Sequence, residues 1–238
     1  MPSGWRPAEV RLADFVAGAR AARGLVVVID VFRAFSVAAH AFARGARTII
    51  PVADIADARE LKRQQPDWLL IGERHARPLP GFDAGNSPTE IERLELRDRT
   101  IIHTTHSGTQ GLTAATGADE VITGALVNAA AIVRYIRSRA PAAVTLVRMG
   151  HEATERCAED DLCAELLQQR LAGEQPDVSG VRKRLRSAAS AQKFFDPDCD
   201  WAPQRDFELC TQVDAFDFVL RLDRGQRPAR LTRTEVPP

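Results

Sequence analysis

The chain has 238 residues, of which 45% are hydrophobic and 27% are charged, and 32 basic residues balance 32 acidic ones. This length and composition are typical of a folded globular protein with a good-sized core. The zero formal net charge argues against a nucleic-acid-binding protein that relies on bulk positive charge, but it leaves room for a local cationic pocket.

The first residues, MPSGWRPAEVRLADF, lack the apolar run of a signal peptide. No apolar stretch approaches the roughly 20 residues that are needed to span a bilayer. The four cysteines show neither CxxC spacing nor the density of a disulfide framework. We therefore expect a cytoplasmic protein with reduced thiols and with neither membrane nor nucleic-acid partners.

Short apolar runs alternate with amphipathic segments along the chain. Leu25–Ile29 is β-branched and unbroken, which is typical of a central strand covered on both faces. Further strands are predicted at 48–52, 68–71, 100–103, 120–123, 144–148 and 216–222. Helices are predicted at 34–44, 55–65, 110–116, 125–139, 155–171 and 179–195. This alternation predicts an α/β/α layered fold with a mostly parallel sheet flanked by helices.

We expect residues 1–238 to form a single unit, with a weak break at 173–177 as the position where it could subdivide. The tail at 227–238 is predicted to be frayed. The loop at 73–90 is predicted to be functional, because so long a loop inside a compact chain is usually either functional or disordered.

Polar residues follow the predicted strands at their carboxyl ends, where open α/β sheets bind ligands. Carboxylates there are candidate ligands for Mg²⁺, which prefers hard oxygen ligands. The candidates are Asp30, Glu73, Asp83 and Glu159 or Asp160. Arg33 and Arg74 could grip phosphate oxygens with their forked donors. The turn at 107–109 could offer backbone N–H groups to an anion at a helix N-terminus.

These candidates also have structural interpretations. Asp30 could cap the helix that begins at Ala34, because Asp is a favoured N-cap residue. Glu73 and Arg74 could form a surface ion pair. The segment GFDAGNSP could be a structural turn whose polar side chains bond their own backbone. The two carboxylates at 159–160 could be acidic residues that the dipole of a helix favours.

Several familiar sites are absent from the sequence. There is neither a GxxxxGK[ST] P-loop nor a GxSxG elbow. Phosphatases of the haloacid dehalogenase type would carry a second Asp two residues after the first, where this chain has Phe32. The five histidines show no metal-binding spacing, so a three-histidine zinc site is not expected. The basic cluster at 182–186 is interpreted as a solvated helix face.

The order of five motifs resembles the 2-phosphosulfolactate phosphatase family. They are DVFRA at 30–34, GER at 72–74, GFDAGNSP at 81–88, TTHSGT at 104–109 and a Glu-Asp pair at 159–160. The Glu-Asp pair comes before a helix that contains Cys-Ala. The resemblance covers roughly residues 24–170, and GER followed by GFDAGNSP is its most specific part.

The resemblance implies a phosphoric monoester hydrolase that uses Mg²⁺ to convert (2R)-phospho-3-sulfolactate, or a related phosphorylated hydroxy acid, to the hydroxy acid and phosphate. That step belongs to coenzyme M biosynthesis. Carried over by position, the residues implied as catalytic are Asp30, Arg33 and Glu73, and those implied as metal ligands are Asp30, Glu73, Asp83, Glu159 and Asp160. Those implied as substrate-binding are Arg74, Asn86, Ser87, Thr104, Thr105, Gly108 and Thr109.

The chain departs from the family pattern at two positions beside the anion site. Ser107 stands where the family has Asn, and Gln110 stands where it has a basic residue. Arg148 or His151 could replace the lost cation. The alternative function is therefore a non-catalytic member of the fold that binds a small anion. The expected partner is a small phosphorylated anionic substrate, and a homodimer is left open as the assembly.

Overall fold

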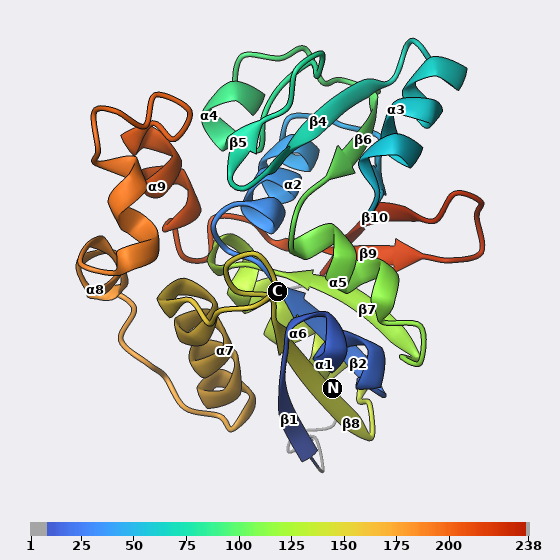
Figure 1. Cartoon of the computed structure of the whole chain (residues 1–238). Coiled ribbons are helices and arrows are strands. Elements are labelled where there is room, and N and C mark those ends of the chain that lie inside the picture. The colour runs from blue at the N-terminus through green and yellow to red at the C-terminus, as the bar shows by residue number, and fades with distance from the viewer. Residues whose placement is uncertain (1–8, 237–238) are drawn as a thin grey trace.

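The computed structural model describes residues 9–236. Within these residues the strands form one ten-stranded sheet with helices packed on both of its faces (Figure 1). The predicted α/β/α layering, with a mostly parallel sheet, is thereby confirmed.

Strands and helices alternate along residues 9–148, apart from one pair of successive strands. The strands are β1 (Glu9–Asp14), β2 (Leu25–Ile29), β3 (Thr48–Pro51), β4 (Leu69–Arg74), β5 (Arg77–Pro78), β6 (Thr100–Thr104), β7 (Glu120–Gly124), β8 (Ala143–Arg148), β9 (Phe218–Asp223) and β10 (Arg230–Glu235). The α-helices are α1 (Phe15–Ala21), α2 (Ala34–Ala43), α3 (Ile55–Gln64), α4 (Pro88–Ile91), α5 (Gly108–Ala114), α6 (Ala129–Arg139), α7 (Ala158–Leu171), α8 (Val181–Arg186) and α9 (Gln204–Cys210). Two 3₁₀ helices are η1 (Leu126–Asn128) and η2 (Ala189–Phe194).

The sheet consists of two parallel blocks that run in opposite directions. One block has the order β1-β8-β2-β7 and the other β3-β6-β4, with the antiparallel hairpin β9–β10 between them. Because β7 pairs antiparallel with β9 and β10 pairs antiparallel with β3, three successive reversals separate the blocks. In Figure 1, β4 and β6 descend toward the middle of the molecule while β2 and β8 rise toward it.

The carboxyl ends of the two blocks therefore converge on one region instead of sharing one straight edge. Strand twist of about 20–25° per step accumulates across the hairpin and turns the blocks toward each other. The hairpin pairs with each block through a single residue pair, Ile122 with Arg221 and Leu231 with Ile49. A hydrogen bond between His75, after β4, and Glu152, after β8, joins the two ends.

The core forms on both faces of the sheet because strand residues alternate between them. In β2, Val26 and Val28 pack on the face covered by α1, α2 and α5. Leu25, Val27 and Ile29 pack on the opposite face with α6, α7 and the C-terminal helices. All five β2 side chains are buried, as expected for a strand that is covered on both sides.

Several elements differ from the predictions. The tail was predicted to be frayed, but residues 230–235 form β10 and pair with β9, while 237–238 lie outside the described residues. The predicted helix at 179–195 is two short helices, α8 and η2. Strand β1, helix α1 and helix α9 were not predicted. Strands β1 and β10 bury few side chains, so their sequences carry little hydrophobic signal.

The chain between α7 and α8, which includes 173–177, leads from the first block to the C-terminal helices, and β9 and β10 then return to the same sheet. None of the helices in residues 9–236 is both long and apolar enough to cross a membrane.

Gly72, in β4, is a position where only glycine fits. Its φ is +147°, and a Cβ atom there would lie 1.9 Å from the backbone oxygen of Thr104. We expect Gly72→Ala to lower the free energy of unfolding by more than about 1 kcal/mol, because the backbone of β4 or β6 must move. Urea denaturation would measure the loss. Gly180→Ala is the control, since a Cβ at Gly180 meets nothing within 4 Å; equal effects of the two substitutions would contradict this explanation.

Candidate active site

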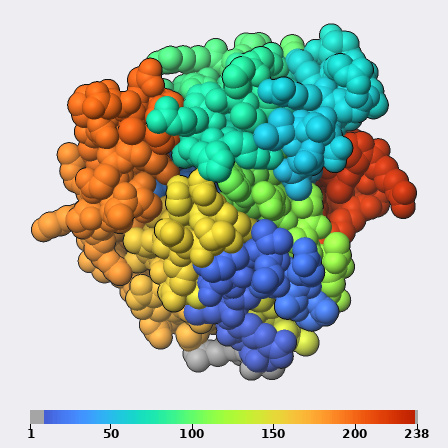
Figure 2. Space-filling model, in the orientation of Figure 1, coloured from blue at the N-terminus to red at the C-terminus, as the bar shows by residue number. Residues whose placement is uncertain are grey.

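A cavity of about 580 Å³ lies where the two strand blocks converge. Figure 2 shows a hollow where the teal, yellow and orange parts of the surface meet. The cavity is lined by residues that follow β2, β4, β6 and β8 and by residues from η2 and the segment after it. The predicted site residues that line it are Asp30, Arg33, Glu73, Asn86, Glu159 and Asp160.

Asp30 both caps a helix and faces the cavity, so the two interpretations of its sequence position coexist. Its Oδ1 accepts a hydrogen bond from the backbone N–H of Ala34 at 3.1 Å. Burial raises the pKa of Asp30 to about 7, and the nearby carboxylates of Glu73 and Glu159 add to the rise. Within residues 9–236, no hydrogen bond to Oδ2 is made, so this oxygen remains available to a ligand.

The two carboxylates at the start of α7 are also buried at the cavity. Asp160 accepts backbone N–H groups from Val31 at 2.9 Å and from Gly150 at 2.8 Å, which ties α7 to the ends of β2 and β8. Glu159 accepts the hydroxyl of Ser190 through Oε2. Burial raises the pKa of both carboxyl groups, so it is energetically unfavourable to keep both of them ionised without a counter-ion.

Glu73 connects two loops at the cavity. Its Oε1 accepts the backbone N–H of His106 at 2.7 Å, and its Oε2 accepts the backbone N–H of Ala76 at 2.8 Å. Glu73 is therefore held by the loop after β6 and by the turn between β4 and β5. It is 6% exposed, so it is not half of a surface ion pair.

Arg33 lines the cavity but most of its donors are engaged by the protein. Its Nη1 donates to the carboxylate of Asp206 at 2.6 Å and to the carbonyl of Trp201 at 3.0 Å. Its Nη2 donates to the carbonyl of Ala76 at 3.0 Å. Arg33 is 3% exposed and Asp206 is 0% exposed, so the pair is a buried ion pair between the end of β2 and α9.

Lys193, in η2, supplies the cation that sequence reasoning missed. It lines the cavity and carries no hydrogen bond or ion pair to any residue in the described part of the chain. Burial lowers the pKa of its ammonium group, and the charge of Arg33 adds to this effect. Its segment resembled an ordinary basic helix, so its sequence gave no sign that it faces the same cavity as Glu159.

Asn86 presents an amide to the cavity. Its Oδ1 lies 3.1 Å from Nε2 of His103, which is fully buried in β6. Burial lowers the pKa of His103 to about 3, so the imidazole is neutral and its Nε2–H can donate to the amide oxygen. That bond leaves the amide nitrogen of Asn86 as a donor at the cavity.

Seven predicted site residues do not line the cavity. Asp83 accepts the backbone N–H of Leu70 at 2.7 Å and pairs with Lys62. Arg74 donates to the carbonyls of residues 53 and 73 and to the hydroxyl of Thr104. The remaining five are Ser87, Thr104, Thr105, Gly108 and Thr109.

These remaining residues shape the walls around the site. Thr105 and Thr109 bond each other's backbone N–H groups through their hydroxyls, which closes the turn before α5. Ser87 donates to the Asp206 carboxylate at 2.7 Å. Gly108 allows the close approach of α5, because a Cβ there would lie 2.8 Å from Oδ2 of Asp30.

The two departures from the family pattern have different surroundings. Ser107 lines the cavity and accepts the backbone N–H of Ala153 at 2.9 Å. Gln110 does not line the cavity, and its amide donates to the carbonyl of His106. Of the two residues suggested as replacement cations, His151 lines the cavity, whereas Arg148 pairs with Asp14 and Asp161 away from it.

The donor set fits a hard divalent cation. Asp30 and Glu159 each keep one oxygen that accepts no hydrogen bond from another described residue, and burial raises the pKa of both carboxyl groups. Oxygen-rich groups of this kind are what Mg²⁺ binds in proteins.

Comparison with known proteins identifies the family. The family described as 2-phosphosulpholactate phosphatase matches residues 13–225 of the chain. A protein of Caldanaerobacter subterraneus subsp. tengcongensis named "Probable 2-phosphosulfolactate phosphatase" is 33% identical over 214 residues, which cover 84% of this chain and 88% of the relative. Proteins of the same name from Thermotoga petrophila and Bacillus subtilis are 33% and 28% identical and cover 84% and 85% of this chain, and 89% of each relative.

The match extends beyond the motifs at 30–160 to most of the described chain. The resemblance that these motifs indicated is confirmed, and so is the class of phosphoric monoester hydrolases that it implied. This chain belongs to the 2-phosphosulfolactate phosphatase family.

Proposed function

We propose that the protein is a Mg²⁺-dependent phosphatase that hydrolyses (2R)-phospho-3-sulfolactate, or a related phosphorylated hydroxy acid, to the hydroxy acid and phosphate. The observation that carries this proposal is the cavity itself. Buried carboxylates with unpartnered oxygens lie in it together with Lys193, whose ammonium group makes no hydrogen bond or ion pair with any described residue. Cations and carboxylates so arranged suit a substrate phosphate bound beside a metal ion.

Asp30 and Glu159 would hold the Mg²⁺ through their unpartnered oxygens, with Glu73 and Asp160 completing the negative environment. When bound, Mg²⁺ would withdraw charge from the phosphoryl group and so stabilise the transition state. Asp83 would act outside the cavity, where its bond to Leu70 fixes the start of the GFDAGNSP segment against β4.

Lys193 would bind the phosphate directly, because a phosphate oxygen satisfies both its charge and its donors. Arg33 would contribute positive charge from a fixed position, since Asp206 and two carbonyls hold its guanidinium. The amide nitrogen of Asn86 would donate to the substrate from the opposite loop. Arg74 and Thr104, which bond each other, would support the loop after β4 instead of contacting substrate.

Water is the nucleophile that this cavity favours. Burial raises the pKa of the Cys157 thiol, so this cavity-lining cysteine is not a ready thiolate. The proton of the attacking water would pass to a carboxylate of the group, and burial raises the pKa of Asp30 and of Glu159, which strengthens both as proton acceptors.

The first experiment measures phosphate release from (2R)-phospho-3-sulfolactate and from phospholactate, with and without MgCl₂. We expect Mg²⁺-dependent release, and a preference for the first substrate identifies the sulfonate as part of recognition. Stabilisation of the protein by phosphosulfolactate in a thermal-shift assay without phosphate release, across several divalent metals, would instead favour the anion-binding alternative.

Lys193→Ala tests the phosphate contact. We expect KM to rise about 10- to 100-fold, because a charge-assisted hydrogen bond contributes about 1.5–3 kcal/mol. Lys193→Arg should restore most of the affinity. Lys183→Ala removes an exposed cation from α8 and is the matched control. A KM for Lys193→Ala equal to that of the control would remove Lys193 from the substrate site.

A further inference from the structure

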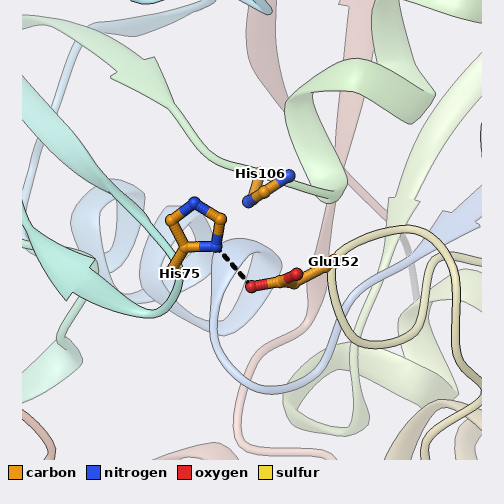
Figure 3. Close-up of side chains that lie close together, drawn as sticks. All are labelled: His75, His106 and Glu152. Carbon is orange, nitrogen blue, oxygen red and sulfur yellow. Dashed lines mark hydrogen bonds and ion pairs between the residues drawn. The ribbon is translucent and has the colours of Figure 1, made fainter.

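A second group of metal-ligating side chains lies at the mouth of the same cavity. His75, His106 and Glu152 each present a ligand atom, and these atoms all lie within 4.8 Å of one another. Figure 3 shows the three side chains pointing toward one another from separate loops. His75 follows β4, His106 follows β6 and Glu152 follows β8. The histidines showed no metal-binding spacing in the sequence because the members of this group come from three separate loops.

We propose that His75, His106 and Glu152 form a second divalent-cation site, which takes a borderline transition metal such as Zn²⁺ in preference to Mg²⁺. Two imidazoles and one carboxylate suit such metals, whereas Mg²⁺ favours oxygen ligands alone. The proposal concerns metal binding, so it stands whether or not the cavity hydrolyses phosphate.

The ligand atoms are close to the spacing that such a metal needs. Zn–N and Zn–O bonds of about 2.0–2.1 Å in a tetrahedron place ligand atoms roughly 3.3 Å apart. Nδ1 of His75 and Oε1 of Glu152 are 2.5 Å apart, and the rings of His75 and His106 meet edge to face with centroids 4.8 Å apart. The side chain of His75 is 70% exposed, so it is free to rotate by the small amount required.

His106 supplies an independent indication. Its Nδ1 is buried and has no hydrogen-bond partner among the described residues. Such orphaned polar atoms are uncommon in folded proteins, and a water or an ion ordinarily satisfies them. A hydrogen bond between His75 and Glu152 alone would explain two members of the group but would leave His106 unexplained.

The position of the group also favours a cation. All three residues line the cavity, and three protein ligands leave a fourth position for a water or an anion inside it.

Glu73 links this site to the carboxylate site. It accepts the backbone N–H of His106 itself and that of Ala76, the residue after His75. One buried carboxylate thus fixes both histidine-bearing loops, and it lines the cavity beside Asp30. The two sites are neighbours with different ligand chemistry.

Isothermal titration of the metal-stripped protein with ZnCl₂, in excess MgCl₂ and in a Cys199→Ser background, tests the proposal. The background removes Cys199, which is the most exposed of the four cysteines. We expect one equivalent of Zn²⁺ to bind despite the Mg²⁺. His75→Asn and Glu152→Gln should each weaken binding by at least about tenfold. Co²⁺ bound in place of Zn²⁺ should show the visible absorption of a low-coordinate nitrogen–oxygen site, and His106→Asn should abolish it.

Two control variants separate this site from its neighbours. His151→Asn removes a cavity-lining imidazole that lies outside the cluster, and Asp30→Asn alters the carboxylate site. Both should retain Zn²⁺ affinity, and the melting temperature of each variant reports whether it is folded. Loss of Zn²⁺ binding in Asp30→Asn, unchanged binding in the His75→Asn and Glu152→Gln variants, or no binding by the parent protein would each overturn the proposal.

Discussion

Replacing Asp30 by asparagine is expected to lower kcat/KM for phosphate release about 1000-fold while raising the melting temperature of the metal-free protein. The activity falls because the amide loses the charge that would hold Mg²⁺, and metal stabilisation of a transferring phosphoryl group is worth several kcal/mol. The amide keeps the acceptor oxygen that caps α2 through Ala34, so the local fold is preserved.

The gain in stability follows from the raised pKa of Asp30. Burial moves that pKa from 3.8 to about 7, so the folded protein binds more protons than the unfolded chain between these values. The free energy of unfolding therefore falls as the pH rises from about 4 to about 7. Asparagine does not titrate, and the variant should melt on the order of 5 °C higher above pH 7.

Differential scanning calorimetry in EDTA at several pH values, together with a phosphate-release assay, measures both effects. The difference in melting temperature between the variant and the parent protein should grow with pH and vanish near pH 4. Added MgCl₂ should stabilise the parent protein and leave the variant unchanged. A variant that retains full activity, or that melts below the parent at pH 8, would show that Asp30 is a helix cap without a ligand role.

Replacing Asp206 by alanine is expected to cost about 3–5 kcal/mol of stability, because it leaves the buried guanidinium of Arg33 without its counter-charge. Asp206 is 0% exposed and also accepts the Ser87 hydroxyl and the backbone N–H of Thr89. One carboxylate in α9 therefore holds the end of β2 and the GFDAGNSP segment together. The melting temperature should fall by roughly 10 °C.

Arg205→Ala is the matched control for Asp206→Ala. Arg205 is the preceding residue in α9 and pairs with Glu92, but its side chain is 55% exposed. Exposed ion pairs contribute about 0–1 kcal/mol, so this variant should melt close to the parent protein. Guanidinium denaturation of both variants gives the comparison. If the two free energies of unfolding fall by the same small amount, the Arg33–Asp206 pair does not organise the site.

Much of both strand blocks and of their helices could be predicted from the sequence. The unbroken apolar run at Leu25–Ile29 is β2, and the apolar runs near 48, 100, 120 and 144 are also strands. Burial on both sheet faces requires such runs, so the signal is strong where the strand is central. The edge strand β1 and the hairpin strand β10 bury few residues and escaped prediction for that reason.

The sequence by itself determined the fold class, the family and a site that begins at Asp30, because strand-end carboxylates and the order of five motifs are local features of the chain. Only the tertiary structure decided which of those residues share a cavity. The parallel pairing of β2 with β8 places Glu159 near Asp30, and the convergence of the second strand block adds Glu73 to the cavity that Lys193 also lines and leaves Asp83 outside. Strand direction and twist act between segments far apart in the sequence, so no local pattern records them.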